Sequence, residues 1–374
     1  MTTLSSLPEG PLPVPSPGGA PAQGRRPTMR DVAAMAGVSF KTVSRVVNDE
    51  PGVSPGVAAR VRAAAAELGY RPNAAATALR RADGRTATFG VLLEDCGNPF
   101  FAAVLRGIER VARERGVAVF SSSPDLDLAR EQDMSAAYAA RQVDALIVAP
   151  TESAATHLRR AADEGVRVVL VDRPLSGLSA PVVLADNRAG ARAGVEHLIA
   201  HGHTRIGYIG RDPSIFTSQE RFAGFAEALV AAGIPLDPAL VRRDGATRSS
   251  AHADIAALLD LASPPTALFA AQDIITMSAV GALQHRGLQD RVALVGFDDF
   301  ELADLLDPGV TVVAQDPHRM GEIAAEIALY GAAHAAGSVA ASGEGLPARD
   351  EARIVPTRLI VRGSGEITAP PAGG

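Results

Sequence analysis

The hydrophobic pattern of the chain changes once, near residue 84, and this change limits the fold more than any other feature. Residues 28–80 have a helical pattern with alanine-rich stretches and without the alternation typical of strands. After a short linker at 83–85, apolar runs alternate with helix-like stretches, which is the pattern of βαβ units in parallel sheets. These runs include 89–93, 117–121, 145–148, 168–171, 206–209, 267–270 and 292–295. About ten such runs exceed what one compact sheet usually holds, so we expect an all-α N-terminal domain followed by two α/β subdomains.

Positive charge is concentrated in the N-terminal part of the chain. The 374 residues have a formal net charge of −6. Residues 25–81 contain ten basic residues and four acidic ones, which gives +6 for this segment and leaves −12 for the rest. A basic segment on an acidic body is expected where one end of a protein contacts phosphate groups, and a chance solvated face is the alternative.

Several classes of protein are disfavoured by the sequence. No apolar run reaches the ~20 residues needed to cross a bilayer. The Pro/Gly-rich residues 1–26 have neither the basic start nor the apolar centre of a secretory signal, so we expect a disordered tail and a cytoplasmic protein. The single cysteine, Cys96, excludes an internal disulfide and a cysteine metal cluster.

An enzyme is not expected either. None of the eight histidines accompanies a nucleophile elbow or has metal-ligand spacing, and no GxxxxGK[ST] phosphate loop is present. His197, His201 and His203 lie close in sequence, but we interpret His201 and His203 as surface or capping residues. The sequence therefore predicts no catalytic residue, no metal site and no cofactor.

Residues 30–68 predict three short helices with a basic outer surface. Gly37 ends the first helix in a turn, and Ser39 is well placed to cap a second helix over 40–48. A third helix begins at Ser54-Pro55 and continues to about residue 68. The outward residues near the start of the second helix are Phe40, Lys41, Ser44 and Arg45. A recognition helix places such positions against base edges in the major groove of DNA.

The same segment resembles a known family. Residues 28–33 read TMRDVA, 36–39 read AGVS, 42–48 read TVSRVVN, 53–54 read VS and 68–73 read LGYRPN. In this order and spacing, these strings resemble the helix-turn-helix DNA-binding domain of the lactose/galactose repressor (LacI/GalR) family. The resemblance places this domain at 27–71, after the tail at 1–26, and implies double-stranded operator DNA as a partner.

The resemblance implies roles for individual residues of this domain. Phe40, Lys41 and Arg45 occupy the positions that read bases, with Lys41 donating to a guanine and Arg45 suited to a bidentate contact. Phosphate contacts are implied for Thr28, Ser39, Thr42, Ser44 and Asn48. The alternatives are a partly exposed core position for Phe40 and plain surface charge for Lys41 and Arg45.

Residues 72–84 correspond to the hinge helix and linker of the family. Pro72 ends the third helix, and Asn73 can cap a new helix over 74–79 that is too short to be stable alone. In the family this helix becomes ordered on operator DNA and pairs with its dimer mate, so we include Asn73 and Leu79 in the DNA-binding set. Leu79 matches a leucine that wedges between base pairs in the minor groove, and packing of Leu79 on the core is the alternative.

The remaining chain, 85–362, resembles the family's periplasmic-binding-protein-like (type I) core, in which a ligand binds between two Rossmann-like parallel-sheet subdomains. The expected boundaries are 85–184 and 315–345 for the N-subdomain, 185–312 and 350–362 for the C-subdomain, and 363–374 for a flexible tail. The fold class expected for the whole chain is α/β with an all-α N-terminal helix-turn-helix domain. The absence of leucine heptads at the C-terminus favours a homodimer over a tethered tetramer.

Open α/β sheets bind ligands at the carboxyl ends of their strands, and the effector-binding residues expected there are Asn98, Phe100, Phe101, Asp172, Arg221, Gln272 and Asp298. The resemblance implies that Arg221 grips the ligand and that Asp298 accepts sugar hydroxyls. A guanidinium fork suits both hydroxyls and carboxylates. The structural alternatives are an ion pair for Arg221, a loop cap for Asp298 and a core position for Phe100.

Two departures from the family leave the identity of the effector open. Gln272 stands where many relatives have asparagine, and Gly245-Ala246 stand where many have an aromatic residue. The features together predict a DNA-binding transcription regulator, usually a repressor, that binds a pseudo-palindromic operator as a homodimer. Its effector is expected to be a sugar or related metabolite, acting as inducer or corepressor. The alternative is a sugar-binding protein without a DNA role, which the helix-turn-helix pattern and the missing signal disfavour.

Overall fold

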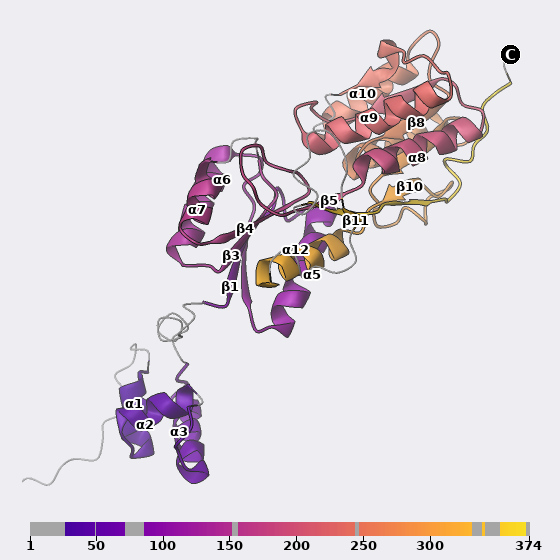
Figure 1. Ribbon diagram of the computed structural model, residues 1–374. Coiled ribbons are helices and arrows are strands. Elements are labelled where there is room, and N and C mark those ends of the chain that lie inside the picture. Colours follow the sequence, from indigo (N-terminus) through magenta and orange to yellow (C-terminus); the bar gives the residue numbers. More distant parts are fainter. Residues whose placement is uncertain are drawn as a thin grey trace, which may run out of the picture. The chain divides into compact units, whose positions relative to one another are not determined.

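The computed structural model describes residues 27–48, 50–71, 86–151, 156–243, 247–330, 339–340 and 352–371. The chain divides into two compact units, Met1–Gly84 and Arg85–Gly374 (Figure 1). Asn73 and Leu79 of the expected hinge lie outside the described residues, and so do Gly245-Ala246. Among the helices that are described, none has the length and apolarity needed to span a membrane.

The first unit contains three short helices, α1 (Met29–Ala36), α2 (Phe40–Val47) and α3 (Pro55–Glu67). Gly37 ends α1 in the left-handed conformation, with φ of 61°, which glycine adopts without steric cost. The Ser39 hydroxyl caps α2 by accepting a hydrogen bond from the backbone N–H of Thr42. Small apolar side chains fill the space between the helices: Val32, Ala33, Ala36, Val43, Val46, Val61 and Ala64. This core uses the inner face of α2 and leaves its outer face exposed.

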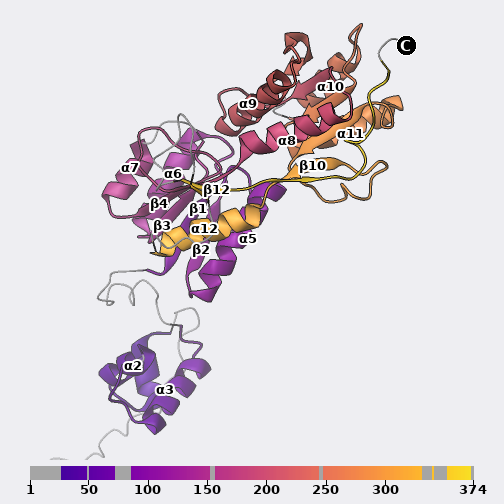
Figure 2. The same cartoon turned by 45° about the vertical axis from the view of Figure 1, so that its right-hand side comes forward.

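The first subdomain of the second unit is built on a seven-stranded sheet with the order β11-β12-β5-β4-β3-β1-β2. The strands are β1 (Thr88–Leu92), β2 (Ala118–Ser122), β3 (Ala145–Val148), β4 (Arg167–Val171), β5 (Val182–Ala185), β11 (Val339–Ala340) and β12 (Ala352–Val355). All neighbours are parallel except β11 and β12. One face of the sheet is covered by α5 (Pro99–Glu114) and α12 (Pro317–Tyr330), and the other by α6 (Leu128–Ala140) and α7 (Thr156–Asp163) (Figure 2).

The second subdomain repeats this arrangement on a six-stranded sheet with the order β13-β10-β9-β8-β6-β7. The strands are β6 (Ile206–Ile209), β7 (Val241–Arg242), β8 (Ala267–Ala270), β9 (Ala293–Phe297), β10 (Thr311–Ala314) and β13 (Arg358–Ile360), with a short 3-10 helix at Pro238–Leu240. Only the pair β10 and β13 is antiparallel among the described strands of this sheet. Helices α8 (Asn187–Ala200) and α9 (Phe216–Ala231) pack on one face, and α10 (Arg248–Leu259) and α11 (Asp273–Arg286) on the other.

The last crossing between the sheets lies later in the chain than we expected. The prediction that 350–362 belongs entirely to the C-subdomain is wrong, because β12 pairs in parallel with β5 of the first sheet. Ala352 and Val355 are buried in the first subdomain, and the chain enters the second sheet only at β13. A four-residue strand carries too little pattern to reveal a partner that lies so far away in the sequence.

The expected flexible tail is also wrong for residues 363–369, which contact the second subdomain. Ser364 is 4% exposed, and its hydroxyl donates to the backbone carbonyl of Leu294. The Glu366 carboxylate accepts a hydrogen bond from Thr311. His203, which we expected to be a surface or capping residue, is fully buried and lies 2.7 Å from the backbone carbonyl oxygen of Ile367. Polar contacts fix this segment, and a polar composition alone does not distinguish such a segment from a disordered one.

Candidate functional site

The exposed face of α2 carries the residues expected to read DNA. Phe40 is 50% exposed and does not belong to the core of the first unit. Lys41 is exposed, and the side chain of Arg45 is partly exposed, 4.0 Å from the carboxylate of Glu50. Such an exposed ion pair is weak, so it leaves the Arg45 guanidinium able to bind another acceptor. The outer face of α2 therefore offers two cations and an aromatic ring to a partner.

The residues expected to contact phosphates lie at the start of α1, at both ends of α2 and within α2. Thr28 is exposed at the start of α1. At the start of α2, the hydroxyls of Ser39 and Thr42 lie 2.9 Å apart. At its end, the Asn48 amide donates to the Ser44 hydroxyl across 3.3 Å. Short polar side chains at helix ends are suited to bonds with phosphate oxygens, which fix position without reading sequence.

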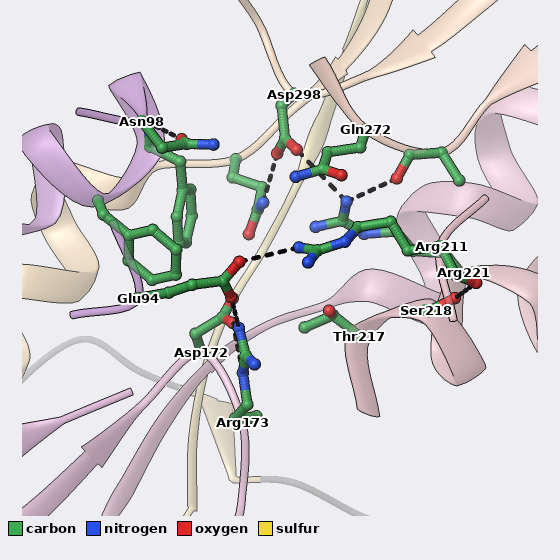
Figure 3. A pocket seen from close by; sticks show the side chains of 14 residues that line it. Glu94, Asn98, Asp172, Arg173, Arg211, Thr217, Ser218, Arg221, Gln272 and Asp298 are labelled. Atoms are coloured by element: carbon green, nitrogen blue, oxygen red, sulfur yellow. Dashed lines mark hydrogen bonds and ion pairs between the residues drawn. The ribbon is translucent and has the colours of Figure 1, made fainter. Parts of the chain in front are cut away.

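A pocket in the second unit lies where the carboxyl ends of strands from both sheets meet (Figure 3). Its volume is about 470 Å³, part of which is open to solvent. The seven residues expected from the sequence all line it: Asn98, Phe100, Phe101, Asp172, Arg221, Gln272 and Asp298. The other lining residues are Glu94, Arg173, Arg211, Thr217, Ser218, Ala271 and Gln315.

Arg221 of α9 is held firmly in the wall of the pocket. Its Nε donates to the side-chain oxygen of Asn187 at 2.8 Å, and its Nη1 donates to the Ala271 carbonyl at 2.7 Å. The same Nη1 lies 3.3 Å from the Asp298 carboxylate, and the guanidinium lies over the ring of Phe297. The ion pair considered as a structural alternative for Arg221 is therefore present, and it fixes the orientation of the guanidinium at the pocket.

Two aspartates hold corresponding places in the two subdomains. Asp172 follows β4 and Asp298 follows β9, and both have left-handed backbones, with φ of 72° and 71°. Aspartate tolerates this conformation better than most residues, and such conformations are frequent at ligand sites. Asp172 is bound by Arg173, while Asp298 is bound by Arg221 and by the Gln315 amide. Each carboxylate thus lines the pocket with an arginine already bound to it.

Of the two aromatic rings that follow β1 in the pocket lining, only that of Phe100 lies outside the buried core. The Asn98 side chain caps α5 by accepting from the backbone N–H of Phe100. Phe101 is 5% exposed and belongs to the core of the first subdomain, so it supports the wall of the pocket. Phe100 is partly buried against that core, with its ring edge-on to Phe101.

Comparisons with known proteins agree with this geometry. Residues 28–73 match the model for bacterial regulatory proteins of the lacI family, and 195–365 match that for a periplasmic binding protein-like domain. The HTH-type transcriptional repressor PurR of Aliivibrio salmonicida is 30% identical over 307 residues, which are 81% of this chain and 91% of the relative. The chain belongs to the LacI family.

Other family members and solved structures are similar over comparable lengths. The HTH-type transcriptional regulator GalR of Salmonella typhimurium is 33% identical over 81% of this chain and 88% of its own length. The complex of the transcriptional regulator CelR with cellobiose has a TM-score of 0.64 and 30% identity, over 91% of this chain and 100% of that one. A Lac repressor dimer bound to operator and an anti-inducer has a TM-score of 0.76 and 25% identity, over 91% and 99%. This LacI-family chain is thus a DNA-binding transcriptional regulator rather than an enzyme, as the sequence predicted.

The sequence analysis of this LacI-family chain missed six charged or polar residues of the pocket: Glu94, Arg173, Arg211, Thr217, Ser218 and Gln315. Three of them illustrate why. Glu94 follows β1, Arg211 follows β6 and Gln315 follows β10. All three lie just beyond the carboxyl ends of strands, so the rule that found the other seven residues also applied to them. They were overlooked because no family motif singled them out.

Burial and neighbouring charges shift the pKa values of several carboxyl groups here. Burial raises the pKa of Asp172, although Arg173 and Arg221 oppose the shift. Burial also raises the pKa of Asp273, to about 6, with a further contribution from the nearby Asp298. Glu94 is the opposite case, because Arg173 and Arg211 outweigh its burial and lower its pKa. The Glu94 carboxylate is therefore charged whenever the protein is near neutral pH.

Proposed function

We propose that this LacI-family regulator reads a pseudo-palindromic operator as a homodimer, with a carbohydrate bound in the pocket controlling its affinity for DNA. The observation that carries the proposal is the convergence of polar side chains from both sheets on one pocket. Carboxylates, amides and guanidinium groups together supply the acceptors and donors that hydroxyl groups require.

Solved relatives support a carbohydrate as the ligand. The CelR complex contains cellobiose, and a LacI-family regulator from Enterococcus faecium contains ribose. In the present chain, the ring of Phe100 and the pairs formed by Arg221 with Asp298 and by Asp172 with Arg173 offer one apolar wall and several hydrogen-bonding groups. We therefore assign the seven predicted pocket residues to effector binding, with Phe101 supporting the pocket wall from the core.

For DNA recognition we assign base contacts to Phe40, Lys41 and Arg45 of α2. Each bidentate or directed contact of this kind discriminates against a wrong base by about 1–3 kcal/mol. One such helix reads few base pairs, and two helices related by a dimer axis read two half-sites. The proposed dimer works in the bacterial cytoplasm, where operator DNA is accessible.

Asn73 and Leu79 keep their predicted hinge role in this proposal. Leu79→Ala is expected to weaken operator binding and DNA bending while leaving carbohydrate binding unchanged, because a minor-groove wedge acts only on the DNA side. Gel-shift bending assays together with calorimetric titration of the sugar separate the two effects. Operator affinity equal to that of the wild type would contradict the wedge.

One experiment tests the whole function. D-Glucose, D-galactose, D-ribose and cellobiose are screened by thermal shift, and DNA is selected from a random duplex library with and without the sugar that stabilises the protein most. We expect enrichment of a palindrome, with a sugar-dependent change in affinity whose sign distinguishes induction from corepression. The paired variant Lys41→Ala/Arg45→Ala should lose enrichment and keep the thermal shift. A protein that enriches no sequence under any condition would contradict the regulator, whatever it binds in the pocket.

A further inference from the structure

Glu94 connects the two subdomains across the pocket. It lies directly beyond β1 of the first sheet, with its side chain 13% exposed. One carboxylate oxygen accepts from Arg173 of the same subdomain at 2.6 Å. The other accepts from Arg211, which follows β6 of the second sheet, at 3.0 Å. Figure 3 shows Glu94 placed between these two guanidinium groups.

The three arginines of the pocket differ in how fully their donors are used. Arg173 binds both Asp172 and Glu94. Arg221 binds Asn187, the Ala271 carbonyl and Asp298, as described above. Arg211 instead donates to Glu94 through Nη1, and its buried Nε has no hydrogen-bond partner within the described part of the chain. Among the described residues Arg211 has a single side-chain hydrogen-bond partner, Glu94, so it is the guanidinium of the three with the fewest partners.

We propose that Glu94 is a specificity-determining residue that restricts the effector to neutral molecules by neutralising Arg211 across the cleft. The inference rests on the proposed function of the pocket. The lining carries three carboxylates, Glu94, Asp172 and Asp298, and three guanidinium groups, so its formal charge is balanced. A neutral hydroxyl group placed beside Arg211 leaves this balance undisturbed. A ligand carboxylate at the same place would lie beside the ionised Glu94.

The expected size of this discrimination follows from simple electrostatics. Two like charges about 5 Å apart in a partly buried site, with an effective dielectric constant of ~20, repel each other strongly enough to change an affinity by roughly a hundredfold or more. Removal of the Glu94 charge would abolish the repulsion and leave Arg211 unpaired. A guanidinium released in this way binds carboxylates well, because its fork matches their geometry.

The test compares sugars that differ only at C6, where a CH₂OH group is replaced by a carboxylate. The pairs are D-glucose with D-glucuronate and D-galactose with D-galacturonate, titrated by calorimetry at pH 7.5 into wild type, Glu94→Gln and the double variant Glu94→Gln/Arg211→Gln. Glutamine keeps the shape of glutamate and removes its charge. Glu114→Gln, which removes an equal charge from an exposed ion pair with Arg110, is the matched control.

The proposal expects the wild type and E114Q to bind the neutral member of a pair at least about tenfold more tightly than the uronate. E94Q should bind the uronate about tenfold or more tightly relative to the neutral sugar than the wild type does. The double variant should lose this gain in uronate affinity, because the uronate carboxylate needs Arg211. An unchanged preference in E94Q, with neutral sugar still bound, overturns the role of Glu94 and leaves the carbohydrate effector intact.

Two further outcomes are also decisive. A wild type that binds a uronate as tightly as its neutral partner overturns the proposal without any variant, and it remains decisive if E94Q fails to fold by circular dichroism. A wild type that binds none of these four sugars, and neither ribose nor cellobiose, contradicts the proposed carbohydrate effector. In that case uronate binding that appears in E94Q supports the role of Glu94, and its absence overturns it.

Discussion

The two functional regions of this protein use arginine in opposite ways. In the DNA-binding unit, Arg45 is partly exposed and has only a loose ion pair with Glu50. In the pocket, Arg221 is 7% exposed and bound on several sides. An exposed cation contributes to binding a phosphate backbone or a base and little to folding, whereas a buried one is part of the structure that holds the ligand site. The comparison shows that the role of an arginine depends on the burial and the partners of its guanidinium group.

Arg221→Ala should have the largest effect on stability. It leaves Asp298 and the Asn187 amide buried without their cationic partner, which typically costs about 3–5 kcal/mol. Chemical unfolding of the core, followed by circular dichroism, measures this loss. The control Arg192→Ala removes an exposed pair with Glu196 and should cost less than about 1 kcal/mol. Equal losses of unfolding free energy in both variants would contradict the distinction between buried and exposed arginines.

Arg45→Ala should act on DNA binding alone. Loss of a base contact is expected to weaken operator binding by about 1–3 kcal/mol and to relax specificity at one position of each half-site. The unfolding free energy should change by less than about 0.5 kcal/mol, because the side chain is partly exposed and its ion pair is long. Fluorescence anisotropy with selected and random duplexes gives both affinities. Arg60→Ala, an exposed change on α3, should leave the ratio of the two affinities unchanged.

Asp273→Asn should reveal the cost of a buried charge at the start of α11 through its pH dependence. The pKa of Asp273 is raised from the ordinary value of 3.8 to about 6, so the folded protein holds a proton that the unfolded chain has lost between these two pH values. The ionised carboxyl therefore destabilises the wild type above pH 6, and the cost disappears as the pH falls toward 4. We expect the variant to be more stable by about 1–3 kcal/mol at pH 8 and equal near pH 4. Thermal unfolding over this range measures the difference, and a pH-independent difference would contradict it.

Glu50→Gln should give the smallest effect. This substitution removes the partner of Arg45 in the exposed unit, just as Glu94→Gln removes the partner of Arg211 in the pocket. We expect less than about 0.5 kcal/mol in unfolding and a modest increase in DNA affinity, because one negative charge near the phosphates is lost. Anisotropy titrations at two salt concentrations test this. A large loss of stability would show that the pair with Arg45 is structural.

Much of the architecture could be predicted from the sequence because it depends on local patterns. The valine spacing of α2 and the cap at Ser39 are set within a few residues, and the apolar runs identify most strands. Most of the predicted pocket residues converge because they follow the carboxyl ends of strands, whereas Arg221 reaches the pocket from α9 and was identified through the family resemblance. The sequence did not reveal β12 or the ordered residues 363–369, since their partners lie in other segments of the chain.

The sequence by itself determined that a basic three-helix unit precedes a pair of parallel α/β subdomains, and which surface of α2 is free to meet DNA. These features follow from hydrophobic periodicity and from exposed side chains whose positions are set by their own helix. Only the tertiary structure decided which charges meet in the pocket, because Glu94 and Arg211 are brought together from different sheets. The pKa and the role of a buried charge depend on such partners. Strand pairing across the whole core determines which charged residues become partners.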